Sequence, residues 1–254
     1  MARTVLLDID GVLTVSSEPL PGAVETLCWL REQGIVFGLV TNTSSKPRRE
    51  IVANLNEMGI EVTSRQIFTA VSSAERFLTS QFPGASCLIV NQGSLDEDLA
   101  GIEMADSSTP GVVLLGAAGR SVGYCELDRV FKLALSGVPV VALHRNLRFQ
   151  TADGPALDMG AFIVGLEAAA RMEIPVLGKP SPDFFLAALV DLGAEATETV
   201  IVGDDIDSDV RGGQAVGMTG VLVRTGKYRA SDLESEGQSP DFVIDDIRHL
   251  CDLL

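Results

Sequence analysis

An apolar segment that ends in two aspartates constrains the fold of this chain more than any other feature. The run Val5-Leu6-Leu7 is unbroken, which is typical of a strand buried on both faces of a parallel sheet. Asp8 and Asp10 follow it and point to the same side, because side chains alternate along a strand with a period of two. Gly11 then allows the chain to turn sharply. Such paired carboxylates suit a hard cation such as Mg²⁺ and the phosphate that it carries.

Three further polar segments follow, each at the end of an expected strand or the start of an expected helix. They are Thr41-Asn42 after the apolar residues 36–40, Gly178-Lys179-Pro180 before a helix, and Asp204 with Asp209 after the apolar residues 199–203. Taken alone, Asp8 and Asp10 are compatible with a simple polar turn that closes a strand. The ordered set of four segments favours a functional site.

Strands and helices are expected to alternate in residues 1–75 and again after residue 176, as in a doubly wound parallel sheet. Helices are expected after Pro21, over 46–58, 182–192 and 207–216 and at the C-terminal end, between strands at 67–68, 176–177, 199–203, 219–223 and 241–244. In such sheets ligands bind beyond the carboxyl ends of the strands. We therefore expect Asp8, Thr41 and Asp204 to converge there.

Residues 76–175 form an insertion with a pattern of its own. Strands are expected at 88–90, 112–115 and 138–143, with a helix over 126–135. We expect this insertion to be a cap domain that closes over the site, excludes bulk water and contributes substrate contacts.

Two loops of the insertion are candidates for ligand contacts. The segment from Gly116 to Gly123 hints at a phosphate loop, but it lacks the Lys-Ser/Thr pair of a nucleotide-binding loop, which favours a turn. The loop from His144 to Pro155 is an open alternative for reading the leaving group of a substrate. Its polar residues are Arg145, Arg148, Gln150 and Asp153.

The four segments together resemble the haloacid dehalogenase superfamily of aspartate-nucleophile phosphohydrolases, from residue 4 to the C-terminus. The resemblance implies an α/β fold with a Rossmannoid catalytic core over residues 1–75 and 176–254. It also implies a C2-type cap over residues 76–175, because the insertion lies between Thr41 and Lys179. The segments 178–185 and 223–228 resemble the type IIA subgroup that contains phospholysine phosphohistidine inorganic pyrophosphate phosphatases and p-nitrophenyl phosphatases.

The resemblance also implies a role for each site residue. Asp8 is expected to be the nucleophile and Asp10 the general acid and base. The carboxylates of Asp8 and Asp204 and the backbone carbonyl of Asp10 are expected to bind Mg²⁺, with Asp209 hydrogen-bonded behind them. The groups expected to bind phosphate oxygens are the Thr41 hydroxyl, the Asn42 backbone amide and the Lys179 ammonium.

The implied function is Mg²⁺-dependent phosphohydrolysis through an aspartyl-phosphate, on a small phosphorylated metabolite, a P–N compound or pyrophosphate. A catalytically idle relative that binds phosphorylated ligands in a regulatory role is the alternative. It would normally lack a motif residue, and all of them are present. Asp205 and Asp207 are instead expected to be solvated acids at a helix start.

The formal charge of −16 argues against nucleic acid or an anionic membrane as a partner. No apolar run approaches the ~20 residues of a membrane span, and the first strand leaves no room for a signal peptide. The four cysteines are far apart, which indicates free thiols in a reducing compartment. We therefore expect a cytoplasmic enzyme with a small phosphorylated substrate, and a homo-oligomer is left open.

Overall fold

The computed structural model describes residues 3–105, 109–119, 122–151, 154–234 and 236–254. Its contacts divide the chain into two compact units. The first comprises Met1–Thr41, Arg48–Phe68 and Lys179–Leu254, and the second comprises Asn42–Pro47 and Thr69–Gly178. Each unit has its own sheet and its own apolar core.

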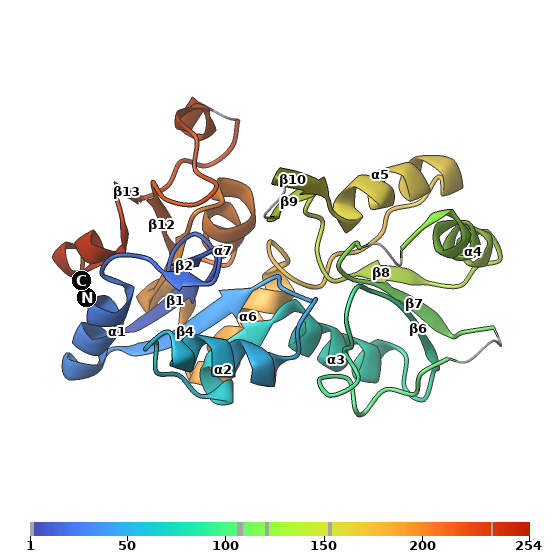
Figure 1. The fold of residues 1–254 in the computed structure, drawn as a ribbon, viewed down its shortest axis with the longest axis horizontal. Helices are drawn as coiled ribbons and strands as arrows, with labels where there is room; N and C mark the ends of the chain where they lie inside the picture. The colour runs from blue at the N-terminus through green and yellow to red at the C-terminus, as the bar shows by residue number, and fades with distance from the viewer. Residues whose placement is uncertain (1–2, 106–108, 120–121, 152–153, 235) are drawn as a thin grey trace. The chain divides into compact units, whose positions relative to one another are not determined.

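A six-stranded sheet runs through the first unit in the order β13-β12-β11-β1-β4-β5 (Figure 1). Its strands are β1 (Thr4–Asp8), β4 (Val36–Thr41), β5 (Ile67–Thr69), β11 (Thr199–Gly203), β12 (Thr219–Val223) and β13 (Phe242–Ile244). β1 pairs in parallel with β4 on one side and with β11 on the other. The chain thus adds strands first to one side of β1 and then to the other, which confirms the predicted doubly wound sheet.

Helices cover both faces of this sheet because its strands are apolar on both faces. They are α1 (Ala23–Glu32), α2 (Arg48–Glu57), α6 (Pro182–Leu192), α7 (Gly212–Gln214) and a π-helix (Ile206–Arg211). Leu7 of β1 belongs to the cluster that contains Leu27 of α1 and Ile51 of α2. The preceding residue of the strand, Leu6, belongs to the opposite cluster with Phe185 of α6. The remaining elements are the hairpin β2 (Thr14–Val15) and β3 (Glu18–Pro19), and the 3₁₀ turns Ser64–Gln66, Ala196–Glu198, Ala230–Glu234 and Ile247–Asp252.

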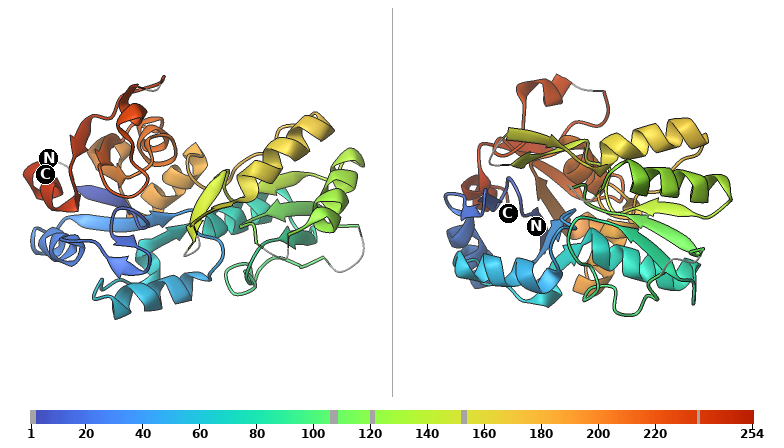
Figure 2. Two further views of the ribbon diagram at one scale, coloured as in Figure 1. Left: turned by 45° about the horizontal axis from the view of Figure 1, so that its top comes forward. Right: turned by 45° about the vertical axis from the view of Figure 1, so that its right-hand side comes forward.

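The second unit contains a parallel sheet of three strands in the order β6-β7-β8. Its elements are β6 (Cys87–Val90), β7 (Val112–Leu115), β8 (Val140–Ala142), the helices α3 (Ala70–Gln81), α4 (Tyr124–Leu135) and α5 (Met159–Ala170), and the antiparallel hairpin β9 (Arg148–Thr151) and β10 (Gly154–Leu157). Leu114 of β7 packs in one cluster with α3, and Val113 packs in the other with α4 and α5. Figure 2 shows α4 and α5 on one face of this sheet and α3 on the other.

Two expectations about the borders of the insertion differ from the structure. Residues 176–177 form no strand of the main sheet, because Val176 makes a single bridge to Ala142 of the second unit. α3 packs as a whole within the second unit, whereas the sequence placed its first residues in the core. The assignment of the two units as catalytic core and cap stays a prediction. No helix in the described part of the chain has the length and apolar character to span a membrane.

Candidate active site

Three predicted site residues stand at the carboxyl ends of adjacent strands in the first unit. Asp8 is the last residue of β1, Thr41 is the last residue of β4, and Asp204 directly follows β11. The ladder pairs Asp8 with Val40, so Thr41 lies one residue beyond the register partner of Asp8. All three side chains are buried, with relative exposures of 5%, 3% and 1%. They therefore lie where a doubly wound sheet binds its ligands.

Lys179 joins two of the acidic side chains. Its ammonium donates to Asp8 Oδ1 at 2.5 Å and to Asp209 Oδ1 at 2.6 Å. Lys179 is 4% exposed and stands shortly before α6, whose first residue is Pro182. Burial alone would lower the pKa of Lys179, but the charges of Asp209 and Asp8 outweigh burial and raise that pKa above its ordinary value. The lysine is therefore a cation at neutral pH.

Three buried carboxylates lie around the Lys179 ammonium, and the charge of Lys227 also acts on all three. Oxygen atoms of Asp8, Asp204 and Asp209 all lie within 4.8 Å of one another. When all three acids are ionised, their negative charge exceeds the positive charge of the two lysines. Burial, together with this mutual repulsion, raises the pKa of Asp204 to about 8 and that of Asp209 to about 6, and burial also raises the pKa of Asp8. The cluster thus has the negative charge that a divalent cation neutralises and the oxygen donors that it binds.

The hydrogen bonds show which carboxylates are available to such a cation. Asp209 uses both oxygens, since Oδ1 accepts from Lys179 and Oδ2 accepts from the backbone N–H of Asp205 at 3.2 Å. Asp204 Oδ2 accepts from the backbone N–H of Lys227 at 2.7 Å. Asp204 Oδ1 is buried and has no hydrogen-bond partner among the described residues. Asp204 and Asp8 therefore fit the role of cation ligands, and Asp209 fits that of a partner behind them.

Asp10 lies in the turn that follows β1. Gly11 there has a φ of +96°, and its N–H donates to the carbonyl of Thr14 at 2.7 Å. A Cβ on Gly11 would lie 2.0 Å from Asp204 Oδ2, so the backbone passes too close to that carboxylate for any side chain. The Asp10 side chain is exposed, and its negative charge helps to raise the pKa of Asp8. The structure thus brings Asp10 close to the buried cluster.

Asn42 directly follows Thr41 but groups with the second unit. A Cβ on Gly178 would lie 2.5 Å from Asn42 Oδ1, so these two segments of the second unit are in close contact. The role of the Asn42 amide in phosphate binding stays a prediction.

Asp205 caps the π-helix, as expected for an acid at a helix start, because its Oδ1 accepts from the N–H groups of Asp207 and Ser208.

The two candidate loops of the insertion belong to the second unit. The loop from His144 to Pro155 contains the hairpin of β9 and β10, and Asp153 lies outside the described residues. In the segment from Gly116 to Gly123, Arg120 and Ser121 also lie outside them. His144 is 2% exposed, with Nδ1 3.9 Å from Asp158 Oδ2, so it is a buried residue of this unit.

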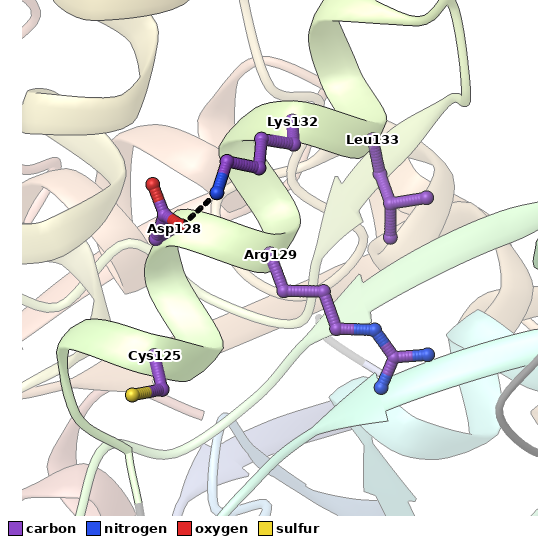
Figure 3. Close-up of a pocket in the computed structure, with 5 residues that line it drawn as sticks. All are labelled: Cys125, Asp128, Arg129, Lys132 and Leu133. Atoms are coloured by element: carbon purple, nitrogen blue, oxygen red, sulfur yellow. Dashed lines mark hydrogen bonds and ion pairs between the residues drawn. The ribbon is translucent and has the colours of Figure 1, made fainter.

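A surface hollow of about 360 Å³ lies on α4 of the second unit. Figure 3 shows that its lining side chains come from this one helix, and they are Cys125, Asp128, Arg129, Lys132 and Leu133. Lys132 pairs with Asp128 across one helical turn. None of the predicted site residues lines this hollow.

The sequence interpretation used the segment 223–228 only for the resemblance to a subgroup and assigned no role at the site to residues 224–228, which follow β12. In the structure the Thr225 hydroxyl donates to the carbonyl of Gly11, and the Lys227 N–H donates to Asp204. A signal was present, because β12 is a fourth strand whose carboxyl end should reach the same edge of the sheet. Lys227 is also one of only four lysines in the chain.

Comparisons with known proteins agree with this geometry. A family model described as haloacid dehalogenase-like hydrolase matches residues 5–105, and a HAD-hydrolase-like model matches residues 176–250. The human haloacid dehalogenase-like hydrolase domain-containing protein 2 is 36% identical over 98% of this chain and 95% of its own length. The phospholysine phosphohistidine inorganic pyrophosphate phosphatase of Xenopus laevis is 33% identical over 99% of this chain and 94% of its own.

A solved structure of the p-nitrophenyl phosphatase from Archaeoglobus fulgidus superimposes on this fold with a TM-score of 0.92. It is 30% identical and covers 100% of this chain and 99% of its own. The resemblance inferred from the four motif segments is thereby confirmed. The chain belongs to the haloacid dehalogenase-like hydrolase family.

Proposed function

We propose that this haloacid dehalogenase-like phosphatase hydrolyses a small phosphorylated compound through an aspartyl-phosphate formed on Asp8. The observation that carries the proposal is the convergence of Asp8, Asp204, Asp209 and Lys179 at the carboxyl end of the parallel sheet. Lys179 holds Asp8 Oδ1 at 2.5 Å, which fixes the orientation of the carboxylate. An oriented, ionised carboxylate is a competent nucleophile toward phosphorus.

The reaction proceeds in two displacements. In the first, a carboxylate oxygen of Asp8 bonds to phosphorus, the bond from phosphorus to the leaving group breaks, and Asp10 donates a proton to the leaving group. In the second, Asp10 takes a proton from a water molecule, which attacks phosphorus and releases phosphate from Asp8. The Thr41 hydroxyl, the Asn42 amide and the Lys179 ammonium hold the phosphoryl oxygens, where positioning and charge neutralisation supply most of the rate enhancement.

Mg²⁺ is the cation that the donor set favours. The carboxylates of Asp8 and Asp204 and the backbone carbonyl of Asp10 would hold it, because hard oxygen donors are the ligands that Mg²⁺ prefers. When bound, it would supply Lewis-acid neutralisation of the negative charge of Asp8 and of the phosphoryl oxygens. Asp209 does not ligate but orients Lys179, since its Oδ1 accepts from that ammonium at 2.6 Å.

The second unit is assigned as a C2-type cap on the basis of its place in the chain, between Thr41 and Lys179. Its expected role is to exclude water and to select the leaving group. The substrate class comprises small phosphomonoesters, P–N compounds and pyrophosphate. An acidic chain of net charge −16 holds such anions through a few local donors and not through a broad positive surface.

The test is phosphate release from p-nitrophenyl phosphate, sugar and nucleotide monophosphates, pyridoxal phosphate, pyrophosphate and phospholysine, with Mg²⁺ and with EDTA. We expect Mg²⁺-dependent release by the wild type. After acid quenching, mass spectrometry of the digest should show a phosphoryl group on the peptide that contains Asp8. Phosphate release without a phosphorylated Asp8 peptide, and unchanged release by Asp8→Asn, would contradict the mechanism.

A further inference from the structure

The segment 224–228, here called the 224–228 loop, connects the ends of three strands of the first unit. The loop begins directly after β12, and Lys227 within it donates its backbone N–H to Asp204 Oδ2 at 2.7 Å. The Thr225 hydroxyl donates to the carbonyl oxygen of Gly11 at 2.5 Å. Through these two bonds the loop holds both the acid that follows β11 and the turn that follows β1.

The backbone of this loop lies so close to Asp204 that a side chain is excluded at Gly226, as it is at Gly11. A Cβ on Gly226 would lie 2.0 Å from Asp204 Oδ2 and 2.6 Å from Gly11 Cα. A Cβ on Gly11 would lie 2.0 Å from the same oxygen. Gly226 also has a φ of +60°, which side chains rarely allow. Two glycine backbones, at Gly11 and Gly226, therefore pack against the same oxygen of Asp204.

The loop also determines which oxygen of Asp204 is available for other partners. Oδ2 is engaged by the Lys227 N–H, while the buried Oδ1 has no hydrogen-bond partner in the described part of the chain. A second attachment strengthens this arrangement, because the Lys227 ammonium lies 3.7 Å from Asp205 Oδ2, on the residue next to Asp204. Backbone and side chain of Lys227 thus both contact the segment after β11.

We propose that the 224–228 loop positions Asp204 and the Asp10–Gly11 turn for the cation, and that Thr225, Gly226 and Lys227 are positioning residues. The inference rests on the proposed function, because the cation is the one assigned there to Asp8, Asp204 and the Asp10 carbonyl. Groups that orient a metal ligand without touching the metal typically change its affinity by about 10–100-fold when they are removed. The loop is thus an element of the site that none of the four sequence motifs contains.

Two pairs of variants test the proposal in the full-length chain. Thr225→Val removes the hydroxyl donor at nearly constant shape, and Thr225→Ser keeps the hydroxyl. Gly226→Ala places a methyl group against Asp204, and Gly193→Ala is its control. Gly193 has nearly the same φ, +64°, but an added Cβ there meets nothing within 4 Å. Both alanine variants therefore carry similar backbone strain, and only Gly226→Ala displaces the Asp204 carboxylate and the Gly11 turn.

The readout is the Mg²⁺ dissociation constant from isothermal titration calorimetry, together with the Mg²⁺ concentration that half-activates phosphate release. We expect Thr225→Val and Gly226→Ala to weaken Mg²⁺ binding by about tenfold or more. Thr225→Ser should bind Mg²⁺ as the wild type does. Gly193→Ala should lose thermal stability without a change in Mg²⁺ affinity. At saturating Mg²⁺, Thr225→Val should recover most of the wild-type turnover number.

Three outcomes would overturn the inference. Folded Thr225→Val and Gly226→Ala proteins that bind Mg²⁺ as tightly as the wild type would remove the loop from the site and leave the proposed function standing. Equal losses of Mg²⁺ affinity in Gly226→Ala and Gly193→Ala would make the effect a general consequence of strain. A wild type that binds no Mg²⁺ would overturn the proposed cation and this inference together.

Discussion

The ammonium of Lys179 lies 2.5 Å from Asp8 Oδ1, although 171 residues separate the two in the chain. It also lies 2.6 Å from Asp209 Oδ1, so one buried cation joins β1, the segment before α6 and the π-helix. All three side chains are almost fully buried. In a low-dielectric interior, the loss of one partner leaves the others as uncompensated charges.

Lys179→Met should therefore destabilise the protein strongly at neutral pH. The substitution leaves the buried carboxylates of Asp8 and Asp209 without their cation, which typically costs about 3–5 kcal/mol. Because burial raises the pKa of both acids, protonation at pH 5 should reduce the loss. Urea unfolding of the metal-free protein at pH 5 and pH 7.5 measures both effects.

Lys132→Met is the matched control for Lys179→Met. Lys132 Nζ lies at the same 2.5 Å distance from Asp128 Oδ2, but the two side chains are 71% and 29% exposed (Figure 3). Exposed ion pairs contribute little because water screens them. We expect no measurable change in the free energy of unfolding, and similar losses in the two variants would show that burial is not the cause.

Asp8→Asn should abolish turnover and leave the fold intact. The amide cannot attack phosphorus, so the rate should fall by at least about 10³-fold. Its oxygen can still accept from Lys179, and loss of one negative charge relieves repulsion in the cluster. The thermal stability of the metal-free protein should therefore be unchanged or higher. Asp207→Asn, at an exposed acid of the π-helix, should keep both activity and stability. Turnover by Asp8→Asn would exclude Asp8 as the nucleophile.

Asp204→Asn should raise the Mg²⁺ requirement. Asp204 Oδ1 is buried without a hydrogen-bond partner among the described residues, which leaves it available as a ligand. An amide oxygen is a weaker ligand than a carboxylate, and the change removes one of the charges that attract the cation. We expect half-activation at a Mg²⁺ concentration at least about 10-fold higher. An unchanged activation curve would remove Asp204 from the ligand set.

The strand ends and the long helix before the last motif could be predicted from the sequence because their signals are local. Continuous apolar runs marked β1, β4 and β11. Pro182 at the first turn and Gly193 after the last residue marked α6, whose observed bounds are Pro182–Leu192. The convergence of Asp8, Thr41 and Asp204 then followed from the rule that ligands bind at the carboxyl ends of parallel strands.

The parts that were missed depend on contacts between distant segments. Thr225 and Lys227 contact Gly11 and Asp204 through a hydroxyl and a backbone N–H. The end of β12 indicated this edge of the sheet, but no residue pattern encodes which backbone N–H bonds to Asp204. The predicted helix over 207–216 is a π-helix followed by the short α7, and the last helix is a 3₁₀ turn. The π-helix has a wider turn than an α-helix but is compatible with the same apolar spacing, so the spacing does not distinguish the two. Tertiary contacts select the wider turn. A Cβ on Gly203 would lie 2.1 Å from Asp209 Cβ, which shows how closely the π-helix packs on β11.

The stability of the metal-free protein should fall as the pH rises from about 5.5 to 8. Burial and mutual repulsion raise the pKa of Asp204 to about 8 and that of Asp209 to about 6, and burial raises the pKa of Asp8. An acid whose pKa is higher in the folded state than in the unfolded state binds more protons when folded. Its stabilising effect is complete below the unfolded pKa and is lost as the pH rises through the folded pKa.

Mg²⁺ should offset this loss, because it binds the deprotonated carboxylates and only in the folded state. The increase in melting temperature caused by Mg²⁺ should therefore be larger at pH 8 than at pH 5.5, by several degrees for a site that contributes ~1–2 kcal/mol. Melting curves in EDTA and in excess Mg²⁺ measure the difference. Asp204→Asn removes the acid whose pKa is raised further than that of Asp209. It should therefore flatten both the pH dependence of stability and the pH dependence of the Mg²⁺ effect. The same pH slope in the wild type and in Asp204→Asn would place the titrating groups elsewhere in the protein.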